Sequence, residues 1–456
     1  MSLLAAACFS ALLFGKIGAL DNGLGLTPPM GWSSWNVYAG EIDENKIMAT
    51  IDAMASLVPS GYEYVNIDDN WMEKSRDEEG NLQVRRDKFP RGIKFLADYA
   101  HSKQLKLGIY SAHGSTTCMG NAGSGPDHWS QDAHLFAAWG IDYLKLDSCG
   151  GYPPNYTSVE EQYREYAAMR DALNATGRPI YYSICENGPI KQTPVIRDSP
   201  SSCGRKGAYS SLPWFSQGYD VKGLANSVLI EWVNNNNHFC VKGPAHCCKS
   251  GWVTQIDSQQ DLTVDELSGP GYWNDNDMLS VGCNEPGRTG PPGTPCEGSQ
   301  SLLEQRGQFA LWAIQASPLI LGHDVTKMGS EVRAIITNSE IISLNQDPLG
   351  HRASIAFQSD AYNRTLTIFV KKLANSSAPR AAAIFNRGEI AANVTLNRIH
   401  MAFDEGTCTC VDLRDLDAHA QIIAGVRAES LVTLQLQPHE VRVVRAHCCS
   451  GEDVLV

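Results

Sequence analysis

The sequence predicts an α/β protein, with a (β/α)8 TIM barrel over residues 21–350 followed by a C-terminal antiparallel β-sandwich domain over residues 351–456. Eight short apolar runs alternate with helix-prone amphipathic stretches between residues 30 and 322, as in a (β/α)8 barrel. Charged or aromatic side chains stand at the ends of most of these runs. After residue 350 the runs become short and alternate apolar with polar residues, which is typical of antiparallel strands. No G-x-G-x-x-G follows the first run, which disfavours an open dinucleotide-binding sheet.

The expected barrel strands are, in chain order, Met30–Trp35, Tyr62–Asp68, Lys106–Ser111, Asp142–Asp147, Ile180–Cys185, Ser227–Glu231, Trp273–Leu279 and Ser317–Leu321. Helical periodicity predicts helices over Asn45–Leu57, Ile93–Lys103, Trp129–Trp139, Val159–Ala175 and Leu302–Gln315. Strands of the β domain are expected at Ile355–Gln358, Thr365–Lys371, Ala381–Phe385, Leu431–Gln437 and Val441–Arg445.

The amino-acid composition restricts the kinds of partner that the protein is expected to bind. The chain has 456 residues, 43% of them hydrophobic and 19% charged, which is enough for one large and one smaller domain. Its formal net charge of −13 disfavours nucleic acid or an anionic membrane as a partner. An acidic surface is compatible with a secreted or lumenal protein that handles a neutral substrate.

Residues 1–20 are expected to be a secretory signal peptide, because an apolar stretch over residues 2–15 precedes small residues near Leu20. No later segment is long enough to span a membrane. Of the 14 cysteines, Cys8 would leave with the signal, and the remaining 13 favour disulfides in an oxidising compartment. The loop from Cys283 to Cys296 contains Gly-Pro-Pro-Gly and is expected to be closed by its own disulfide.

Five Asn-x-Ser/Thr sequons support this location, which is either outside the cell or the lumen of a lysosome or vacuole. They begin at Asn155, Asn174, Asn363, Asn375 and Asn393.

The candidate site residues stand at the C-terminal ends of the predicted strands, where TIM barrels place their active groups. They are Trp35, Asp68, Asp69, Tyr110, Lys145, Asp147, Cys185, Glu186, Glu231, Asp275 and Asp277. Lys145 and Asp147 lie two residues apart, on one side of a strand. Alone, such a pair would be interpreted as a structural ion pair, but carboxylates recur on successive strands and favour a functional pocket.

Carboxylates beside aromatic side chains, with no accompanying histidine or cysteine metal set, indicate carbohydrate chemistry without a metal or other cofactor. In a retaining glycosidase, one carboxylate attacks the anomeric carbon and a second, roughly 5–5.5 Å away, protonates the leaving oxygen. Lys145 is expected to hold Asp147 ionised and to help bind sugar hydroxyls.

Six ordered motifs carry a family resemblance. They are Thr27-Pro-Pro-Met-Gly-Trp-Ser-Ser-Trp-Asn36, Ile67-Asp-Asp69, Leu107-Gly-Ile-Tyr110, Lys145-Leu-Asp-Ser-Cys149, Gly269-Pro-Gly-Tyr-Trp-Asn-Asp-Asn-Asp-Met-Leu279 and Asn345-Gln-Asp-Pro-Leu-Gly350. With these motifs the chain resembles glycoside hydrolase family 27, the α-galactosidases and α-N-acetylgalactosaminidases known as melibiases. The resemblance covers residues 26–350, and the β tail is compatible with it.

The resemblance implies that Asp147 is the nucleophile, which forms a covalent galactosyl-enzyme. It implies that Asp68 and Asp69 bind the 4- and 6-hydroxyls of the sugar, and that Lys145 contacts its 3- and 4-hydroxyls.

By the same resemblance, Trp35 and Tyr110 line the apolar face of the sugar. Cys118 and Cys149 match a family disulfide beside the nucleophile, while Asp275 and Asp277 support the pocket rather than react.

Glu186 bears on specificity. Glutamate after cysteine at this strand end is similar to galactosidases, whereas the N-acetylgalactosaminidases use a small residue there. A buried carboxylate that accepts a hydrogen bond from the 2-hydroxyl would exclude an acetamido group. Asn187 replaces the tryptophan that usually follows in the family.

The sixth strand departs from the family, whose acid/base is an aspartate in an R-x-x-x-D pattern. Here neither that arginine nor that aspartate is present, and Glu231 stands at the nearest matching position. Apolar neighbours can raise the pKa of a glutamate enough for it to act as an acid. Asp257 and Asp220 are the alternatives. His113 follows Tyr110-Ser-Ala in place of the acidic residue common in the family, and is interpreted as a structural rim residue.

These observations predict a secreted retaining exo-α-galactosidase that acts on an oligosaccharide, polysaccharide or glycolipid. One alternative is an α-N-acetylgalactosaminidase or another α-glycosidase of the family. A second, motivated by the missing sixth-strand aspartate, is a galactose-binding protein without activity. A homodimer is compatible with the sequence and is not decided by it.

Overall fold

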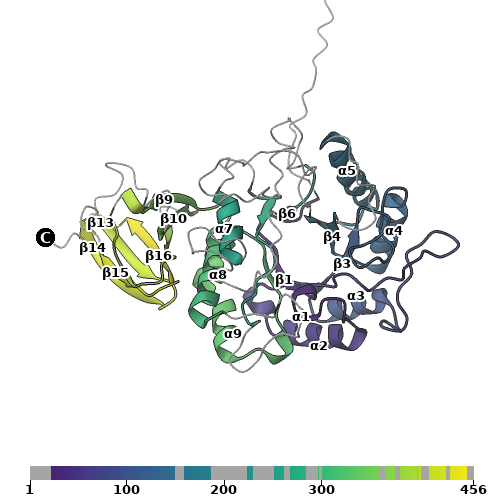
Figure 1. The fold of residues 1–456 in the computed structure, drawn as a ribbon, viewed down its shortest axis with the longest axis horizontal. Coiled ribbons are helices and arrows are strands. Elements are labelled where there is room, and N and C mark those ends of the chain that lie inside the picture. Colours follow the sequence, from purple (N-terminus) through teal and green to yellow (C-terminus); the bar gives the residue numbers. More distant parts are fainter. Residues whose placement is uncertain are drawn as a thin grey trace, which may run out of the picture.

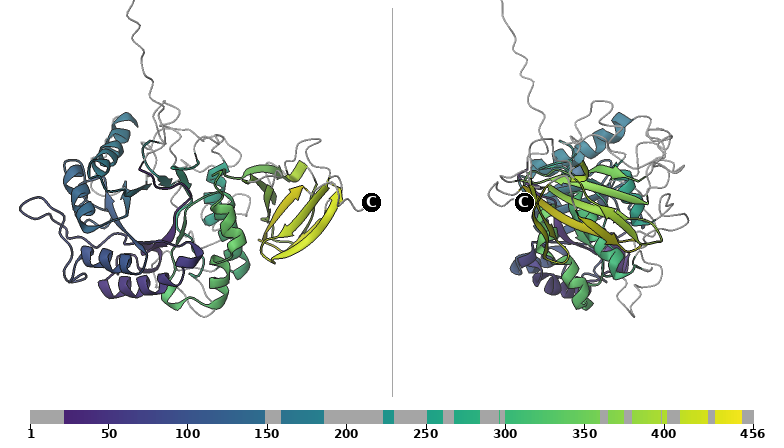
Figure 2. Two further views of the ribbon diagram at one scale, coloured as in Figure 1. Left: turned by 180° about the vertical axis from the view of Figure 1, so that it is seen from behind. Right: turned by 90° about the vertical axis from the view of Figure 1, so that its left-hand side faces the viewer.

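The computed structural model describes residues 22–148, 159–185, 223–229, 251–260, 268–283, 296, 300–359, 365–374, 380–397, 399–401, 410–427 and 432–448. Two parts are evident in Figure 1: a ring of parallel strands surrounded by helices, and a group of antiparallel strands beside it. The left view of Figure 2 shows the same arrangement from behind, and in the right view the antiparallel strands lie in front of the ring. The predicted fold class is confirmed by this architecture.

The barrel is an eight-stranded parallel sheet in the order β7-β6-β5-β4-β3-β2-β1-β8. Its strands are β1 (Met30–Ser33), β2 (Tyr64–Asn66), β3 (Lys106–Ala112), β4 (Tyr143–Asp147), β5 (Tyr181–Cys185), β6 (Ser227–Leu229), β7 (Trp273–Asp275) and β8 (Leu319–Leu321). Leu279, just after β7, closes the ring because it forms a parallel bridge with Leu321 of β8.

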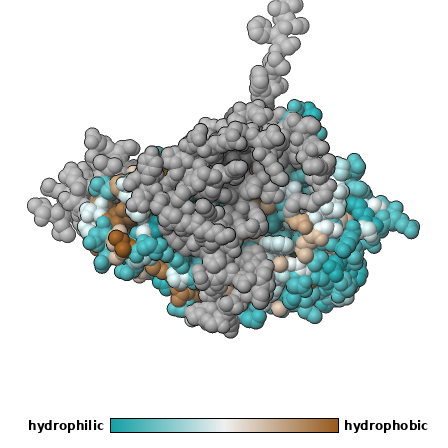
Figure 3. Space-filling view, in the orientation of Figure 1, coloured by the Kyte–Doolittle hydropathy of each residue, from teal (hydrophilic) through white to brown (hydrophobic). Residues whose placement is uncertain are grey.

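Helices cover the outside of the barrel. They are α1 (Trp35–Tyr38), α2 (Glu44–Ala55), α3 (Ile93–Ser102), α4 (Trp129–Trp139), α5 (Val159–Ala175), α7 (Trp252–Gln260), α8 (Leu302–Ile314), α9 (Ser330–Ile336) and α10 (Ser339–Asn345). Three of these helices begin at side-chain caps: Asp43 accepts from the Lys46 backbone before α2, Ser301 forms a capping box with Glu304 before α8, and Asn338 accepts from the backbone of Glu340 before α10. Figure 3 shows that the described surface over the barrel helices is mostly hydrophilic.

The first predicted strand is too long at its C-terminal end. β1 ends at Ser33, and Trp35 is the first residue of the short helix α1 rather than the last residue of a strand. The tryptophan was assigned to the strand because apolar and aromatic residues continue past Ser33, and this pattern does not separate a strand from the helix that follows it. The prediction that Trp35 stands at a strand end is therefore wrong.

Inside the barrel, side chains follow the two-residue period of the strands. Tyr64, Tyr143 and Tyr181, the first residues of β2, β4 and β5, pack together at the N-terminal end of the barrel, and the rings of Tyr143 and Tyr181 stack with centroids 4.8 Å apart. The residues at the C-terminal ends of the same strands consequently point toward the opposite mouth. The barrel therefore has an aromatic floor beneath a polar upper part.

The segment after residue 21 lies under this floor. Leu24 packs against the tyrosine cluster, and the Asn22 side chain donates to the backbone oxygen of Ile180 at 3.0 Å. The oxygen of Gly25 accepts from the indole of Trp273 at 2.6 Å. These contacts tie the start of the described chain to β5 and β7.

The antiparallel part contains a six-stranded sheet, β14-β13-β16-β11-β10-β9, and a two-stranded sheet, β12-β15. Its strands are β9 (Ser354–Gln358), β10 (Leu366–Lys372), β11 (Arg380–Asn386), β12 (Ala392–Thr395), β13 (Cys410–Asp415), β14 (Ala420–Arg427), β15 (Thr433–Leu436) and β16 (Val441–Cys448). The sequence analysis missed β12, β13 and β14. Asp412 and Arg414 in β13 and Ala420 and Gln421 in β14 weaken the β signal of these strands.

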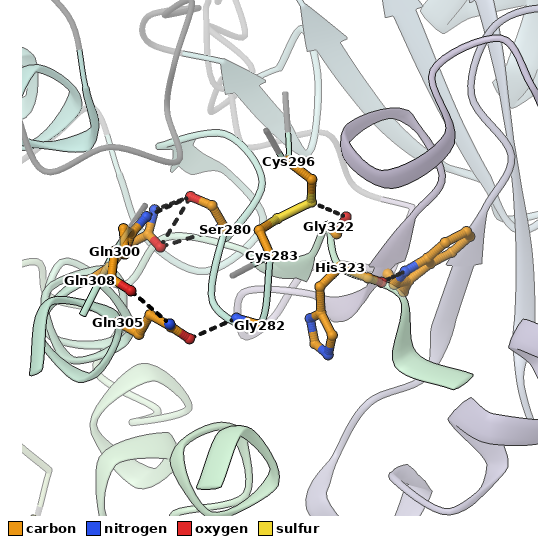
Figure 4. The surroundings of a disulfide bond; sticks show 10 residues. Ser280, Gly282, Cys283, Cys296, Gln300, Gln305, Gln308, Gly322 and His323 are labelled. Carbon is orange, nitrogen blue, oxygen red and sulfur yellow. Dashed lines mark hydrogen bonds between the residues drawn. A yellow bond between two sulfur atoms is a disulfide. The ribbon is translucent and has the colours of Figure 1, made fainter. Parts of the chain in front are cut away.

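The predicted disulfide between Cys283 and Cys296 is confirmed. Figure 4 shows it beside the segment that follows β7. Glutamines of α8 fix this segment, because Gln305 accepts from the backbone of Gly282 at 2.9 Å and Gln308 accepts from the backbone of Ser280 at 3.2 Å. The segment that follows β7 is therefore held at the same end of the barrel as the candidate site.

Candidate active site

Four neighbouring strands bring the candidate residues to one level of the barrel. Asp147 of β4 is paired in register with Cys185 of β5, and Leu229 of β6 is paired with Asp275 of β7. A pocket opens inside the barrel at this level and is lined by Asp68, Lys145, Cys185, Leu229, Asp275 and Asp277, among others. Five of the predicted site residues, namely Asp68, Lys145, Cys185, Asp275 and Asp277, therefore share one pocket.

Lys145 and Asp68 form the central ion pair of this pocket, with the ammonium of Lys145 donating to Asp68 Oδ2 at 2.8 Å. Burial alone would lower the pKa of Lys145. The surrounding carboxylates, Asp68 first among them, outweigh that effect and raise the pKa well above its ordinary value. Lys145 is therefore a permanent positive charge in the pocket.

The carboxylate of Asp147 accepts hydrogen bonds from residues other than Lys145. The backbone of Ser148 donates to Asp147 Oδ1 at 2.7 Å, and the hydroxyl of Tyr110 donates to Oδ2 at 3.0 Å. Within the described part of the chain no ion pair joins Asp147 to Lys145, because the ammonium is on Asp68. Lys145 nevertheless lowers the pKa of Asp147 through its charge, which is the direction that the sequence analysis expects.

The protonation balance of Asp147 follows from these contacts. Burial raises its pKa above the ordinary value, since the side chain is only 8% exposed, and the charge of Lys145 opposes this effect without cancelling it. The disulfide-bonded sulfur of Cys118 lies 3.3 Å from Asp147 Oδ2. A disulfide sulfur carries no proton, so this is a packing contact rather than a hydrogen bond.

Tyr110 and Trp35 do not line the pocket. Tyr110 is fully buried and lies with its hydroxyl between Cys118 and Asp147. Trp35 is half-buried on α1. Both were expected to contact the apolar face of a sugar, and the structure instead gives Tyr110 a contact with the candidate nucleophile.

Asp69 stabilises the loop that follows β3. Its carboxylate accepts from the hydroxyl of Thr117 at 2.9 Å, from the backbone of Met119 at 3.0 Å and from the amide of Asn121 at 3.3 Å. These donors all come from the loop after β3, and Asp69 does not line the pocket. Both observations disfavour the expected contact of Asp69 with a sugar hydroxyl.

Asp257, one alternative acid/base, does not line this pocket. It lies on α7 and forms a fully buried ion pair with Arg387, which follows β11, at 2.8 Å. Its carboxylate is therefore engaged between the barrel and the β domain. His113 is also buried, as expected for a structural residue, and its backbone donates to the oxygen of Asp147 at 2.9 Å.

Four predicted residues, Glu186, Glu231, Asp220 and Cys149, lie outside the described residues. The pairing of Cys118 with Cys149 thus stays a prediction, although Cys118 is disulfide-bonded.

The sequence analysis overlooked three pocket residues below the carboxylates. Asn66, Tyr143 and Ser183 line the lower part of the pocket. Each lies an even number of positions before a residue that was recognised: Asp68, Lys145 or Cys185. Extending the two-residue period downward along each strand would have found them.

In the described part of the chain, no group of three or more histidine, cysteine or acidic side chains could hold a metal ion. Among the same residues no helix combines the length and apolarity needed to cross a bilayer.

Comparison with known proteins identifies the family. The melibiase family model described as Alpha galactosidase A matches residues 27–195 and 249–347. An α-galactosidase of Oryza sativa subsp. japonica is 35% identical over 428 residues, which cover 93% of this chain and 86% of the relative. The chain belongs to the melibiase family of glycoside hydrolases.

Other melibiases extend the match. Alpha-galactosidase A of Cellvibrio japonicus is 39% identical over 332 residues, which cover 72% of this chain and 70% of that protein. The crystal structure of α-galactosidase I from Mortierella vinacea is 31% identical, with a TM-score of 0.75, and the match covers 94% of this chain and 100% of that one. A structure of the Saccharomyces cerevisiae α-galactosidase with raffinose is 25% identical, with a TM-score of 0.73. The barrel and the β domain therefore both belong to the melibiase fold.

The family match has one internal gap, between residues 195 and 249. Asp68, Lys145, Asp147 and Asp277 all lie in matched segments, whereas Glu231 lies in the gap. The departure from the melibiase pattern is therefore concentrated around the sixth strand, where the acid/base is expected.

Proposed function

We propose that this chain is a secreted retaining exo-α-galactosidase that removes terminal α-linked galactose by double displacement. The observation that carries the proposal is the pocket at the C-terminal mouth of the barrel, where the partly buried Asp68–Lys145 pair lies close to Asp147. The family membership and the activity named for the relatives support galactose as the substrate.

In this proposal Asp147 is the nucleophile. One carboxylate oxygen attacks C1 of galactose while the bond from C1 to the aglycone oxygen breaks, and that oxygen takes a proton from the acid/base. Water then attacks C1, gives its proton to the same acid/base and releases Asp147, so that galactose leaves with its original configuration.

Asp68 and Lys145 are the proposed hydroxyl-binding groups. The carboxylate can accept and the ammonium can donate hydrogen bonds in a pocket with little solvent, where such contacts fix the orientation of a sugar. Glu186 is proposed to recognise the 2-hydroxyl, and the signal peptide is proposed to direct the chain to the cell exterior or to a lysosomal or vacuolar lumen.

The test is a panel of aryl glycosides assayed with the secreted chain, together with ¹H NMR of the first galactose released. We expect turnover of the α-galactoside, little turnover of the α-N-acetylgalactosaminide, and α-galactose as the first product. Activity on the acetamido sugar alone would overturn the specificity, and β-galactose as the first product would overturn the retaining mechanism.

A further inference from the structure

A second pair of carboxylates lies in the pocket, and the proposed mechanism does not use it. Asp275 is the last residue of β7, and Asp277 follows two residues later. Both side chains line the pocket together with Asp68 and Lys145. The pocket thus holds one lysine and three carboxylates, with Asp147 as a fourth beside them.

The backbone of Asp277 is held in an unusual conformation. Its φ of 70° is in the left-handed region, which is unfavourable for residues other than glycine, asparagine and aspartate. Its N–H donates to Asp275 Oδ1 at 2.8 Å, and its carbonyl oxygen accepts from the indole of Trp312 at 2.9 Å. These two hydrogen bonds fix the backbone at this position, so the carboxyl of Asp277 has a defined position.

One oxygen of this carboxyl lacks a donor. Asp277 Oδ1 accepts from the backbone of Met278 at 2.7 Å, but Oδ2 is buried and has no hydrogen-bond partner within the described part of the chain. The residue is only 7% exposed. A buried carboxylate oxygen without a donor is costly, and a bound proton lowers that cost because it removes the buried charge.

The charge balance of the pocket also favours a protonated Asp277. If Asp68 and Asp147 are ionised, Lys145 neutralises only one of them, so Asp275 and Asp277 would add further negative charge at a buried site. Burial is the main cause that raises the pKa of Asp275 to about 7 and that of Asp277 to about 6, although Lys145 opposes it in both cases.

We propose that Asp277 works in its protonated, neutral form as a positioning residue, which leaves the ammonium of Lys145 on Asp68. An ionised Asp277 would compete with Asp68 for Lys145 and move the ammonium from the position in which it is offered to a sugar. This inference rests on the proposed galactosidase function and adds a pH-dependent control to the same site.

Several charged or titratable groups surround Asp277. Lys145 attracts its ionised form, whereas Asp68 and Asp147 oppose ionisation. Cys185 on β5 interacts with the same carboxyl, and Asp275 is its neighbour on the chain. Because Asp277 loses its proton near pH 6, activity should fall as the pH rises above that value.

The first test is the pH profile of kcat/KM for Asp277→Asn on an aryl α-galactoside. Asparagine keeps the shape of the neutral carboxyl, cannot ionise and tolerates a positive φ. At pH 7 about a tenth of a group with a pKa of about 6 is still protonated. We therefore expect the ratio of kcat/KM at pH 7 to that at pH 5 to rise about tenfold relative to the wild type.

Two further variants complete this test. Asp277→Gly is also neutral and suits the left-handed backbone, so it should show the same flattened basic limb even if asparagine packs poorly. Asp98→Asn removes an exposed surface carboxylate and should leave the wild-type profile in place. A basic limb that is unchanged from the wild type in both Asp277 variants would overturn the proposal.

The second test does not depend on activity. A carboxyl whose pKa is raised by folding stabilises the protein below its unfolded pKa, and this stabilisation is lost as the pH rises through the folded pKa. From about pH 4 to pH 7 the Tm of the wild type should therefore fall relative to that of Asp277→Asn. A Tm difference that is independent of pH would contradict a protonated Asp277, whereas absent turnover with a pH-dependent difference would contradict only the galactosidase function.

Discussion

Tyr110 has a role in the structure that differs from the one its motif predicted. The sequence pattern predicted an aromatic surface for the sugar, but the buried ring instead presents its hydroxyl to Asp147 Oδ2 at 3.0 Å. Together with the backbone N–H of Ser148, it gives each oxygen of the carboxylate a donor. Donors of this kind favour the ionised form of an aspartate and fix its orientation. Tyr110 therefore positions the proposed nucleophile.

Replacing Tyr110 with phenylalanine should move the acid limb of kcat/KM to higher pH. The hydroxyl lowers the pKa of Asp147, against the larger effect of burial, so its loss leaves the carboxyl protonated over a wider range. A hydrogen bond to a charged group contributes roughly 1.5–3 kcal/mol, which corresponds to a shift of about one pH unit or more.

The matched control is Tyr99→Phe, which removes a surface tyrosine that donates to Asp52 at 2.8 Å. It should leave the profile unchanged. An acid limb that stays in place in Tyr110→Phe would show that the hydroxyl does not act on the group that titrates in catalysis.

At the scale of elements, the barrel strands determine which residues meet. Leu229 lines the pocket as the last described residue of β6, and Glu231 stands two positions further along the chain. Side chains two positions apart on a strand point to the same face. The two-residue spacing from Leu229, which lines the pocket, therefore favours Glu231 over Asp257 as the acid/base.

Glu231→Gln should lower activity most for substrates with poor leaving groups, because an aglycone that leaves readily needs little help from an acid. Added azide should restore turnover of an activated aryl α-galactoside, since azide can replace the water that a general base must activate. Measuring kcat for a series of aryl leaving groups, with and without azide, tests this. Equal rates for wild type and Glu231→Gln across the series would remove Glu231 from the mechanism.

Across the whole molecule, the barrel and the β domain share one hydrophobic core. Buried residues of β10, β11 and β16 belong to the same cluster as those of α8. The buried pair of Asp257 and Arg387 lies in this contact, where the ring of Trp252 stacks on Phe385. A buried charge pair is costly to break, because the remaining charge is left without a partner. This explains why an aspartate that looked like an alternative acid in the sequence is structural.

The sequence was sufficient for the eight barrel strands and five of the helices, because these carry strong periodic patterns, but it did not predict α1, α7, α9 and α10. It was insufficient where a contact depends on tertiary geometry. Lys145 and Asp147 share a strand face, yet the lysine bonds to Asp68, which is 77 positions away and follows β2, the next strand but one. The loop donors that engage Asp69, and the arginine that engages Asp257, come from distant segments that no local pattern connects.

The most direct measurement is the turnover of an aryl α-galactoside by Asp147→Asn, together with the affinity of the same variant for galactose. If Asp147 is the nucleophile, turnover should fall by about 10⁴-fold or more, because the amide cannot form the covalent intermediate. Galactose should still bind, since Asp68 and Lys145 are unchanged. Turnover equal to that of the wild type, with the fold intact, would contradict the assignment.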